Sequence, residues 1–360
     1  MIRHLLVVVL IVSQAWANFP SAIGKNGVVT SSSSHATQIG INVLKDGGNA
    51  IDAAIAVGFA LGVTFPNAGN IGGGGFMVIR LENGDVTTID FRETAPIRSD
   101  RDMYLDEGGN VIQGMSLYSS KAAGVPGTVA GFGYAHEKYG SKSWTYLLRP
   151  SVKLATSGFP LSYRDAMYLN ANKGFLSIDK EASKIFTSKE SYSVGDMFIQ
   201  KDLGETLRRI AIRGYDEFYS GVTAKKIVQC MRRTGGIITL KDLMEYYPIE
   251  RAPITFEYRG HTFHSMPPAS SGGICLAQIL NQLEIMNFDS IGYHSSDHIQ
   301  MMVEAERRAY SDRAEFLGDT DFIEVPMDVL ISDEYAAQRF SDFDFNSIIP
   351  SSQMGSGNLD

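Results

Sequence analysis

The side chain with the clearest chemical potential is Arg92, which lies within the segment DFRETAP at residues 90–96. The segment follows a strand-like run at residues 86–89 and ends at a proline. A guanidinium at the end of a strand is a planar, permanently charged fork that can hold a carboxylate through two parallel hydrogen bonds. Spacing alone leaves a second interpretation open, in which Arg92 forms a buried ion pair with Asp90, Glu93 or a distant acid.

The segment SSGG at residues 270–273 could supply a serine nucleophile beside an oxyanion-binding turn. It lacks the Gly-x-Ser-x-Gly pattern of a nucleophile elbow, and none of the seven histidines has a persuasive acid partner in the sequence. A turn shaped by proline and glycine at the entrance to a core helix is the simpler interpretation of these residues. The chain therefore offers no obvious nucleophile, and Arg92 is expected to clamp a substrate whose reactive atom lies elsewhere.

Two other patterns have weaker chemical meaning. The glycines at residues 72–75 are not followed by Gly-Lys-Ser/Thr and enter a predicted strand, so they indicate close backbone packing rather than a phosphate loop. His261, His264, His294 and His298 lack the tight spacing that is typical of metal ligands. The sequence therefore predicts neither a metal site nor a cofactor.

Apolar periodicity switches between helical and strand-like spacing along the chain, which predicts a mixed α and β class. Asn49 and Asp52 are spaced as a helix cap, and so are Thr239 and Asp242. Strand-like segments at 76–81 and 86–89 flank a turn signal and predict a hairpin, and residues 255–265 alternate as a strand. The predicted helices span residues 35–45, 50–63, 128–139, 144–156, 161–176, 201–213, 274–285 and 298–317.

The longest predicted helix carries charges of alternating sign over residues 304–315. Glu304 and Arg308 are four residues apart, a spacing at which opposite charges pair along a helix. The pattern predicts a salt lattice that is either solvated or shared between helices.

The composition suits a soluble globular protein with a substantial core, since 44% of the residues are hydrophobic and 20% are charged. The net charge of −8 and the lack of a basic stripe argue against nucleic acid as a partner. Only Cys230 and Cys275 are present, both in apolar surroundings, and two buried free thiols are expected.

The two ends of the sequence differ from its middle. Residues 1–17 resemble a secretory signal peptide, with a short basic start, an apolar run and Ala-Trp-Ala at the expected cleavage site. This predicts a periplasmic or secreted protein, with an uncleaved N-terminal anchor as the alternative. One domain is expected over residues 24–347, and the polar residues 348–360 are expected to form a flexible tail.

Several longer blocks, taken together and in order, resemble the γ-glutamyltransferase (glutathione hydrolase) family. They are SSHAT at residues 33–37, DGGNAIDA at 46–53, GNIGGGGF at 69–76, DFRETAP at 90–96, AGVPGT at 123–128, FYSG at 218–221, PPASSGG at 267–273 and EAERRAYSDR at 304–313. The resemblance runs from residue 29 to about residue 352 and covers most of the chain.

The resemblance implies the large-subunit part of an α+β, four-layer αββα sandwich of the N-terminal-nucleophile hydrolase type. In this family a precursor cuts itself into a large and a small subunit, and the new N-terminal threonine of the small subunit is the nucleophile. That threonine is expected just after Asp360, so no catalytic residue is assigned to this chain. Arg92 matches the family arginine that is expected to bind the α-carboxylate of the γ-glutamyl group, and the tail is expected to lead to the processing site.

The implied enzyme is a heterodimer with the small subunit from the same precursor. It would cleave glutathione and related γ-glutamyl compounds and transfer the acyl group to water, amino acids or dipeptides, without a cofactor. Two alternatives stay open. One is a cephalosporin or glutaryl acylase-type relative, and the other is a truncated, inactive periplasmic binding protein.

Overall fold

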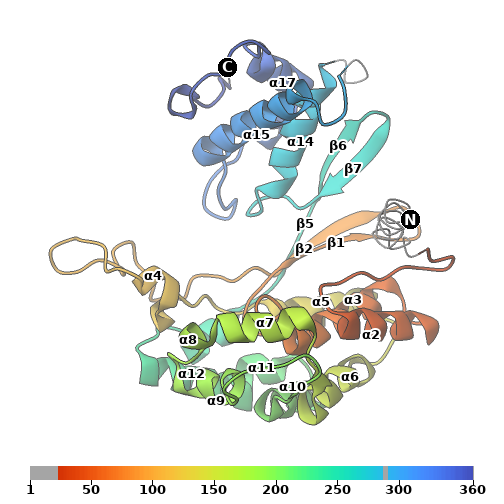
Figure 1. The fold of residues 1–360 in the computed structure, drawn as a ribbon, viewed down its shortest axis with the longest axis vertical. Coiled ribbons are helices and arrows are strands. Elements are labelled where there is room, and N and C mark those ends of the chain that lie inside the picture. The colour runs from red at the N-terminus through yellow and green to blue at the C-terminus, as the bar shows by residue number, and fades with distance from the viewer. Residues whose placement is uncertain (1–22, 287–290, 360) are drawn as a thin grey trace, which may run out of the picture. The chain divides into compact units, whose positions relative to one another are not determined.

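The computed structural model describes residues 23–286 and 291–359 (Figure 1). The chain packs into two compact units, each assembled from two separate segments. Unit 1 consists of Met1–Gly69 and Gly140–Ala211, and unit 2 consists of Asn70–Tyr139 and Ile212–Asp360. The signal peptide expected over residues 1–17 lies outside the described residues.

The described part of unit 1 is mainly helical. The long apolar helix α3 (Ala50–Thr64) packs against both α2 (Ser34–Lys45) and α6 (Trp144–Ser157), and its Ile55, Phe59 and Val63 are completely buried. α3 is thus a core helix, as predicted. Unit 1 also contains α7 (Tyr163–Ala171), α8 (Lys173–Leu176), α9 (Lys180–Phe186), most of α10 (Lys201–Arg213) and the antiparallel pair β3 (Phe159–Pro160) and β4 (Met197–Phe198).

Asp52 fixes the start of α3 and joins it to the segment that leads into α6. Its carboxylate accepts hydrogen bonds from the backbone N–H of Asn49 (2.9 Å) and from the N–H (3.0 Å) and hydroxyl (2.5 Å) of Ser141. The reciprocal bond from the Asp52 N–H to the Asn49 side chain completes the predicted capping box. Burial alone would raise the pKa of this carboxyl, but the bonds that it accepts from Ser141, Asn49 and Lys142 outweigh burial and hold the pKa below its usual value.

Replacing Asp52 with asparagine is expected to destabilise the protein by about 1–3 kcal/mol at neutral pH, because both carboxylate oxygens accept hydrogen bonds and the NH2 group of an amide cannot accept. Since the folded pKa lies below the unfolded value of about 3.9, the stabilisation is present above that value and is lost as the pH falls through the folded pKa. The difference between wild type and Asp52→Asn, measured by denaturant unfolding, should therefore shrink below about pH 4.

Asp165→Asn is the matched control, because Asp165 completes the same type of capping box at the N-terminus of α7 with an exposed Ser162 as its partner. The stability lost by Asp165→Asn should be about 1 kcal/mol or less. Equal losses in the two variants would show that the buried bonds of Asp52 add nothing beyond ordinary capping.

Unit 2 contains a three-stranded antiparallel sheet in the order β1-β2-β5, formed by β1 (Phe76–Arg80), β2 (Val86–Asp90) and β5 (Ile249–Arg251). β1 and β2 form the predicted hairpin (Figure 1). Helices α4 (Met115–Tyr118), η1 (Ser120–Ala122), α5 (Thr128–Tyr139), α11 (Asp216–Ser220), α12 (Val222–Thr234) and α13 (Leu240–Glu245) belong to the same unit.

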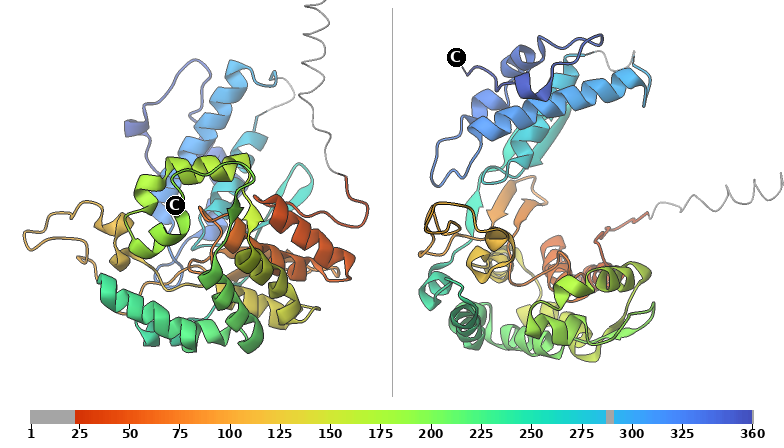
Figure 2. Two further views of the ribbon diagram at one scale, coloured as in Figure 1. Left: turned by 60° about the horizontal axis from the view of Figure 1, so that its bottom comes forward. Right: turned by 60° about the vertical axis from the view of Figure 1, so that its left-hand side comes forward.

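The C-terminal part of unit 2 combines a second hairpin with helices. β6 (Ile254–Tyr258) pairs with β7 (His261–Ser265), and α15 (Ser296–Phe316) lies along α14 (Gly272–Glu284) in Figures 1 and 2. The chain continues through α16 (Met327–Leu330), α17 (Asp333–Phe340) and η3 (Ser351–Gln353).

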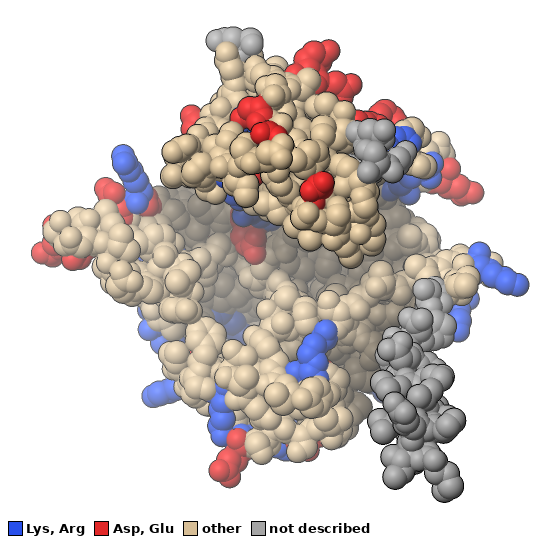
Figure 3. All heavy atoms as spheres, turned by 45° about the horizontal axis from the view of Figure 1, so that its top comes forward, with Lys and Arg blue, Asp and Glu red and all other residues tan. Residues whose placement is uncertain are grey.

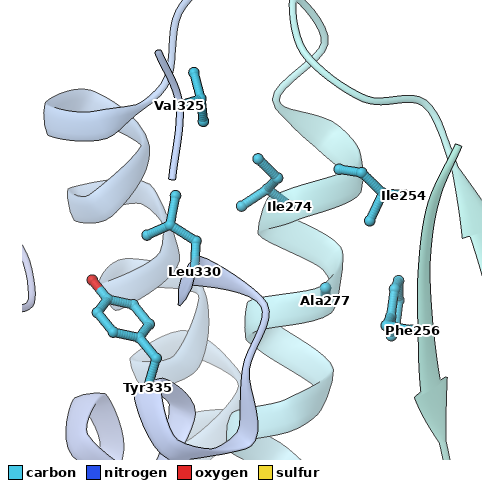
Figure 4. Packing of buried hydrophobic residues seen from close by; sticks show 7 residues of the cluster. All are labelled: Ile254, Phe256, Ile274, Ala277, Val325, Leu330 and Tyr335. Carbon is cyan, nitrogen blue, oxygen red and sulfur yellow. The ribbon is translucent and has the colours of Figure 1, made fainter. Parts of the chain in front are cut away.

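A compact apolar core joins β6, α14 and the segment that follows α15. Its side chains point toward one another between these elements in Figure 4, and they are Ile254, Phe256, Ile274, Ala277, Val325, Leu330 and Tyr335. Because Ile274 and Ala277 anchor the N-terminal half of α14 in this core, the turn at residues 267–271 that precedes it has a fixed end.

Three predictions about local structure need correction. Residues 255–265 form two strands rather than one, since Arg259 and Gly260 adopt positive φ values of 49° and 74° and make a hairpin turn. The helix predicted at 161–176 is interrupted at Asn172, between α7 and α8. Both cysteines are free thiols, as expected, but only Cys275 is buried, whereas Cys230 is partly exposed.

The charged side chains of α15 form a salt lattice that is shared between helices, which is one of the two arrangements predicted from the sequence. Arg308 is only 2% exposed and pairs with Glu304 (2.7 Å) and with Asp342 (2.6 Å), and Arg339 of α17 pairs with Asp312 (3.1 Å). The solvated alternative is wrong for Glu304, Arg308 and Asp312, which are all buried.

Charged side chains of both signs are scattered over the face drawn in Figure 3, and most of that face is uncharged. Among the described residues, no helix combines the length and the apolar character needed to cross a membrane.

Candidate functional site

Arg92 lies at a cavity of about 650 Å³ within unit 2. Three segments far apart in the sequence form its walls: the chain just after β2, the turn before α14, and the end of α15 with the residues that follow it. The lining residues are Arg92, Glu93, Pro268, Ala269, Ser270, Ser271, Arg313, Ala314, Leu317, Gly318 and Asp319. A concave site with a few convergent charged groups is a typical place for a small polar ligand.

The backbone of Arg92 is held by its neighbours while its side chain is exposed. Its N–H donates to the carboxylate of Asp90 (3.0 Å), and its carbonyl accepts from the hydroxyl of Tyr246 (2.8 Å). The guanidinium makes one long hydrogen bond to the carbonyl of Ala269 (3.4 Å). The strand end therefore fixes the position of the side chain without using most of its hydrogen-bond donors.

The ion-pair interpretation of Arg92 is not borne out by the geometry. Asp90 pairs instead with Arg251 of β5 at 2.9 Å, and Arg251 also pairs with Asp321 at 3.0 Å. In residues 23–286 and 291–359, no carboxylate forms an ion pair with the Arg92 guanidinium, although Glu93 lines the same cavity. A cation that no carboxylate of the described chain neutralises is suited to an anionic ligand.

Tyr246 is a positioning residue that sequence analysis did not identify. Its ring stacks on Tyr219 at a centroid distance of 5.7 Å, and the Tyr219 hydroxyl donates to the carbonyl of Pro126 (2.9 Å) and accepts from the N–H of Ala130 (3.0 Å). Burial raises the pKa of Tyr246 above its usual value, so the hydroxyl stays protonated and donates to Arg92 at neutral pH.

The glycine run before β1 packs closely against the Arg92 segment, as predicted. The N–H of Gly75 donates to the carbonyl of Phe91 (3.2 Å), and the N–H of Phe91 donates back to Gly75 (3.0 Å). A Cβ atom added at Gly74 would lie 2.6 Å from the Phe91 carbonyl oxygen and 2.7 Å from the backbone nitrogen of Glu93. Only glycine permits this approach of two backbones.

The structure brings the turn before α14 into the same cavity as Arg92. Ser271 precedes α14, and its hydroxyl accepts a hydrogen bond from Nε of Arg313 at 2.9 Å. Neither Ser270 nor Ser271 has a histidine partner among the described residues, so the serine triad considered from sequence is not formed. The turn shaped by proline and glycine is the better description, but sequence analysis missed that it contributes to the site.

Arg313 was also missed as a cavity residue. Its position on the charged stretch of α15 suggested a salt lattice, and nothing local distinguishes it from Arg307 or Arg308. The only signal in the sequence was that two of the family-like blocks, at 267–273 and 304–313, contain Ser271 and Arg313.

The four clustered histidines occupy two separate places. His261 and His264 lie on β7. His298 lies in the first turn of α15, and His294, just before that helix, donates its N–H to Nδ1 of His298 (3.0 Å). Within the described chain, no group of three or more His, Cys, Asp or Glu side chains is placed to hold a metal ion.

Comparison with known proteins agrees with this architecture. The model of the γ-glutamyltranspeptidase family matches residues 36–358. The chain is 47% identical over 337 residues to the glutathione hydrolase proenzyme of Escherichia coli (strain K12). The matched region covers 93% of this chain and 58% of that protein. It is 34% identical over 325 residues to the acylase ACY 1 proenzyme of Pseudomonas sp. (strain SE83), covering 88% of this chain and 58% of that protein.

The crystal structure of Helicobacter pylori γ-glutamyltranspeptidase matches with a TM-score of 0.91 and 44% identity, covering 94% of this chain and 97% of that one. The predicted α+β fold is therefore confirmed. The chain spans only about 58% of the length of the curated relatives named above. On the extent of the family match and the identity to these relatives, the chain belongs to the γ-glutamyltranspeptidase family.

Proposed function

We propose that this chain is the large subunit of a γ-glutamyltransferase that cleaves glutathione and other γ-glutamyl amides. The observation that supports the proposal most strongly is the Arg92 guanidinium, which faces a cavity without a carboxylate partner in the described chain. Because the chain spans about 58% of its relatives, the reactive groups are assigned to the part that it does not span. The nucleophile is expected to be a threonine that follows Asp360.

In the proposed reaction, Arg92 binds the α-carboxylate of the γ-glutamyl group and so places the γ-carbonyl carbon next to the threonine hydroxyl. The hydroxyl attacks that carbon, and the α-amino group of the same threonine accepts its proton, since such amines titrate near pH 7.7–8.0. The proton passes to the departing amine as the amide bond breaks, which leaves an acyl ester. Water or an amino-acid amine then attacks the ester and regenerates the hydroxyl.

The proposed partner is a small subunit made from the same precursor, which would also complete the four-layer αββα sandwich. The tail at residues 348–360 would lead to the bond that is cut. In the structure this segment contacts α15 and α17, because Gly357 donates to Asp312 (2.9 Å), Ser311 donates to Met354 (3.2 Å) and Arg339 donates to Gly355 (3.0 Å). The mobility of the tail stays a prediction. A mobile tail would have to break these three hydrogen bonds to α15 and α17.

The proposed location is the periplasm or the exterior, which follows from the signal peptide expected at residues 1–17.

The test of the proposed function is expression from the complete reading frame followed by mass spectrometry of the purified protein. Two polypeptides are expected, the second beginning with threonine, together with release of the chromophore from a γ-glutamyl anilide. Replacing the first residue of the second polypeptide with alanine should abolish both cleavage and turnover. A stop codon directly after Asp360, or a single uncut and inactive chain, would contradict the proposal and favour the inactive binding protein.

The second candidate is a glutaryl or cephalosporin acylase, and the 34% identity to an acylase proenzyme is the observation that favours it. A glutaryl group keeps a carboxylate at the position of the γ-glutamyl α-carboxylate and lacks only the α-amine, so Arg92 could hold either acyl group. The residues that discriminate between the two are expected mostly in the small subunit. The rates of hydrolysis of matched glutaryl and γ-glutamyl amides separate the two activities, and faster glutaryl turnover would favour the acylase.

Replacing Gly74 with alanine is expected to lower kcat/KM for a γ-glutamyl anilide by about ten- to a hundredfold. The added Cβ would collide with backbone atoms of Phe91 and Glu93 and displace Arg92 between them, and displacements near 1 Å cost rates of this size. Gly72→Ala is the matched control, because a Cβ at Gly72 meets nothing within 4 Å. Equal activity of the two variants would show that this packing does not position Arg92.

A further inference from the structure

The cavity around Arg92 contains a second guanidinium, that of Arg313, which the proposed reaction does not use. Arg313 lies in the last turn of α15, and its side chain is exposed. One guanidinium is enough to bind a single carboxylate, so the second guanidinium in the cavity is available for another anionic group.

The orientation of Arg313 is set by two neighbours. Its Nε donates to the hydroxyl of Ser271 at 2.9 Å, and its guanidinium carbon lies 5.8 Å from the centre of the Tyr310 ring. A guanidinium has five N–H donors, and the Ser271 bond uses the one on Nε. The four donors on the two terminal nitrogens have no acceptor among residues 23–286 and 291–359.

The charge of Arg313 is likewise left for a ligand. The neighbouring Asp312 is buried and accepts from Arg339, Gln278 and Gly357, so it does not neutralise Arg313. Asp319 lines the cavity but forms no ion pair with Arg313 in the described chain. Arg307 and Arg308 on the same helix differ from Arg313, because both form an ion pair with Glu304.

We propose that Arg313 binds the carboxylate at the far end of the peptide or amino acid that leaves or accepts the γ-glutamyl group. The proposal rests on the proposed function and deepens it, because it names the substrate class as molecules with one carboxylate on each side of the scissile amide. Arg92 takes the carboxylate of the γ-glutamyl side, and Arg313 takes the carboxylate of the other side. Ser271 and Tyr310 hold the Arg313 fork in place for this contact.

The test compares ligands that differ only in that carboxylate, using the processed enzyme from the complete reading frame. Glutathione is compared with its glycine ethyl ester as donor, and glycylglycine is compared with glycylglycinamide as acceptor. Wild type is expected to favour each free acid by about ten- to a hundredfold in kcat/KM, as is usual for a charge-assisted contact. In Arg313→Gln the ratio should fall close to one, and Arg313→Lys should keep part of it because it keeps the charge.

Two further variants separate this role from others. Arg92→Lys should weaken glutathione and its ester equally, because both carry the same γ-glutamyl group. Arg213→Gln, an exposed arginine in the last turn of α10, should leave every ratio unchanged. Collapse of the donor ratio or of the acceptor ratio in Arg313→Gln supports the proposal and shows which molecule supplies the carboxylate.

The proposal is overturned if wild type does not distinguish either acid from its neutral analogue. It is also overturned if Arg313→Gln lowers turnover of glutathione, its ester and a γ-glutamyl anilide by one common factor, which is the pattern of a structural role. Failure of the proposed function looks different, because wild type would then release glutamate from none of the three donors.

Discussion

Replacing Arg92 with alanine is expected to lower kcat/KM for a γ-glutamyl anilide by about 30- to 1,000-fold. Loss of one bidentate, charge-assisted contact should cost on the order of 2–4 kcal/mol of transition-state binding, and each 1.36 kcal/mol is a factor of ten. The structure supports a large effect because the guanidinium has a single long bond, to Ala269 at 3.4 Å, and no carboxylate partner in the described chain. The change in kcat/KM is measured from the initial rates at which the processed enzyme releases the chromophore.

Arg92→Lys should fall between wild type and alanine, since lysine keeps the positive charge but loses the planar fork. Arg98→Ala is the matched control, because Arg98 is an exposed arginine just beyond the same segment and outside the Arg92 cavity. Wild-type kcat/KM in both Arg92 variants would show that this arginine does not recognise the substrate.

The largest effect on stability is expected for Asp312→Ala, about 3–5 kcal/mol. Asp312 is 1% exposed, and its carboxylate accepts from Nε of Arg339 (3.1 Å), from the amide of Gln278 (3.1 Å) and from the N–H of Gly357 (2.9 Å). Removing it leaves a mostly buried guanidinium without its carboxylate, which costs far more than the pair gains when both partners are present. For a chain of 360 residues, calorimetry should show a fall in Tm on the order of 4–7 °C.

Asp342→Ala is the matched control within the same lattice. Asp342 pairs with Arg308 at 2.6 Å, but its side chain is 56% exposed, and Arg308 keeps Glu304 as a partner. The loss should therefore stay within about 1 kcal/mol. If the two variants lost the same stability, burial of Asp312 would not be the reason for its importance.

Features that depend on a few neighbouring residues could be predicted from the sequence. The capping box of α3 is an example, because Asn49 and Asp52 are three residues apart and their bonds form within one helical turn. The β1–β2 hairpin follows from its alternation and turn signal in the same way. Arg92 could be singled out as a candidate from one segment, since its chemical type and its place at a strand end are both local properties, but the segment alone did not exclude an ion pair. Its role in substrate binding stays a prediction.

Features that depend on tertiary packing could not be predicted from the sequence. The bond between Ser271 and Arg313 joins positions 42 residues apart, and only the packing of α14 against α15 brings them together. The hairpin turn at Arg259 and Gly260 was missed for a different reason: Arg259 at positive φ gives no signal, and Gly260, which is a local signal, was included in one continuous strand. Burial of the lattice on α15 was also missed, since alternating charges look the same whether α17 covers them or water does.

The most direct test of the central claim is a crystal structure of the processed enzyme with glutamate bound. The α-carboxylate should lie within about 3 Å of the two terminal nitrogens of Arg92, with the γ-carboxyl next to the N-terminal threonine of the second polypeptide. A carboxylate bound elsewhere, with Arg92 paired to an acidic residue of the partner, would contradict the assignment of Arg92 as the group that recognises the substrate.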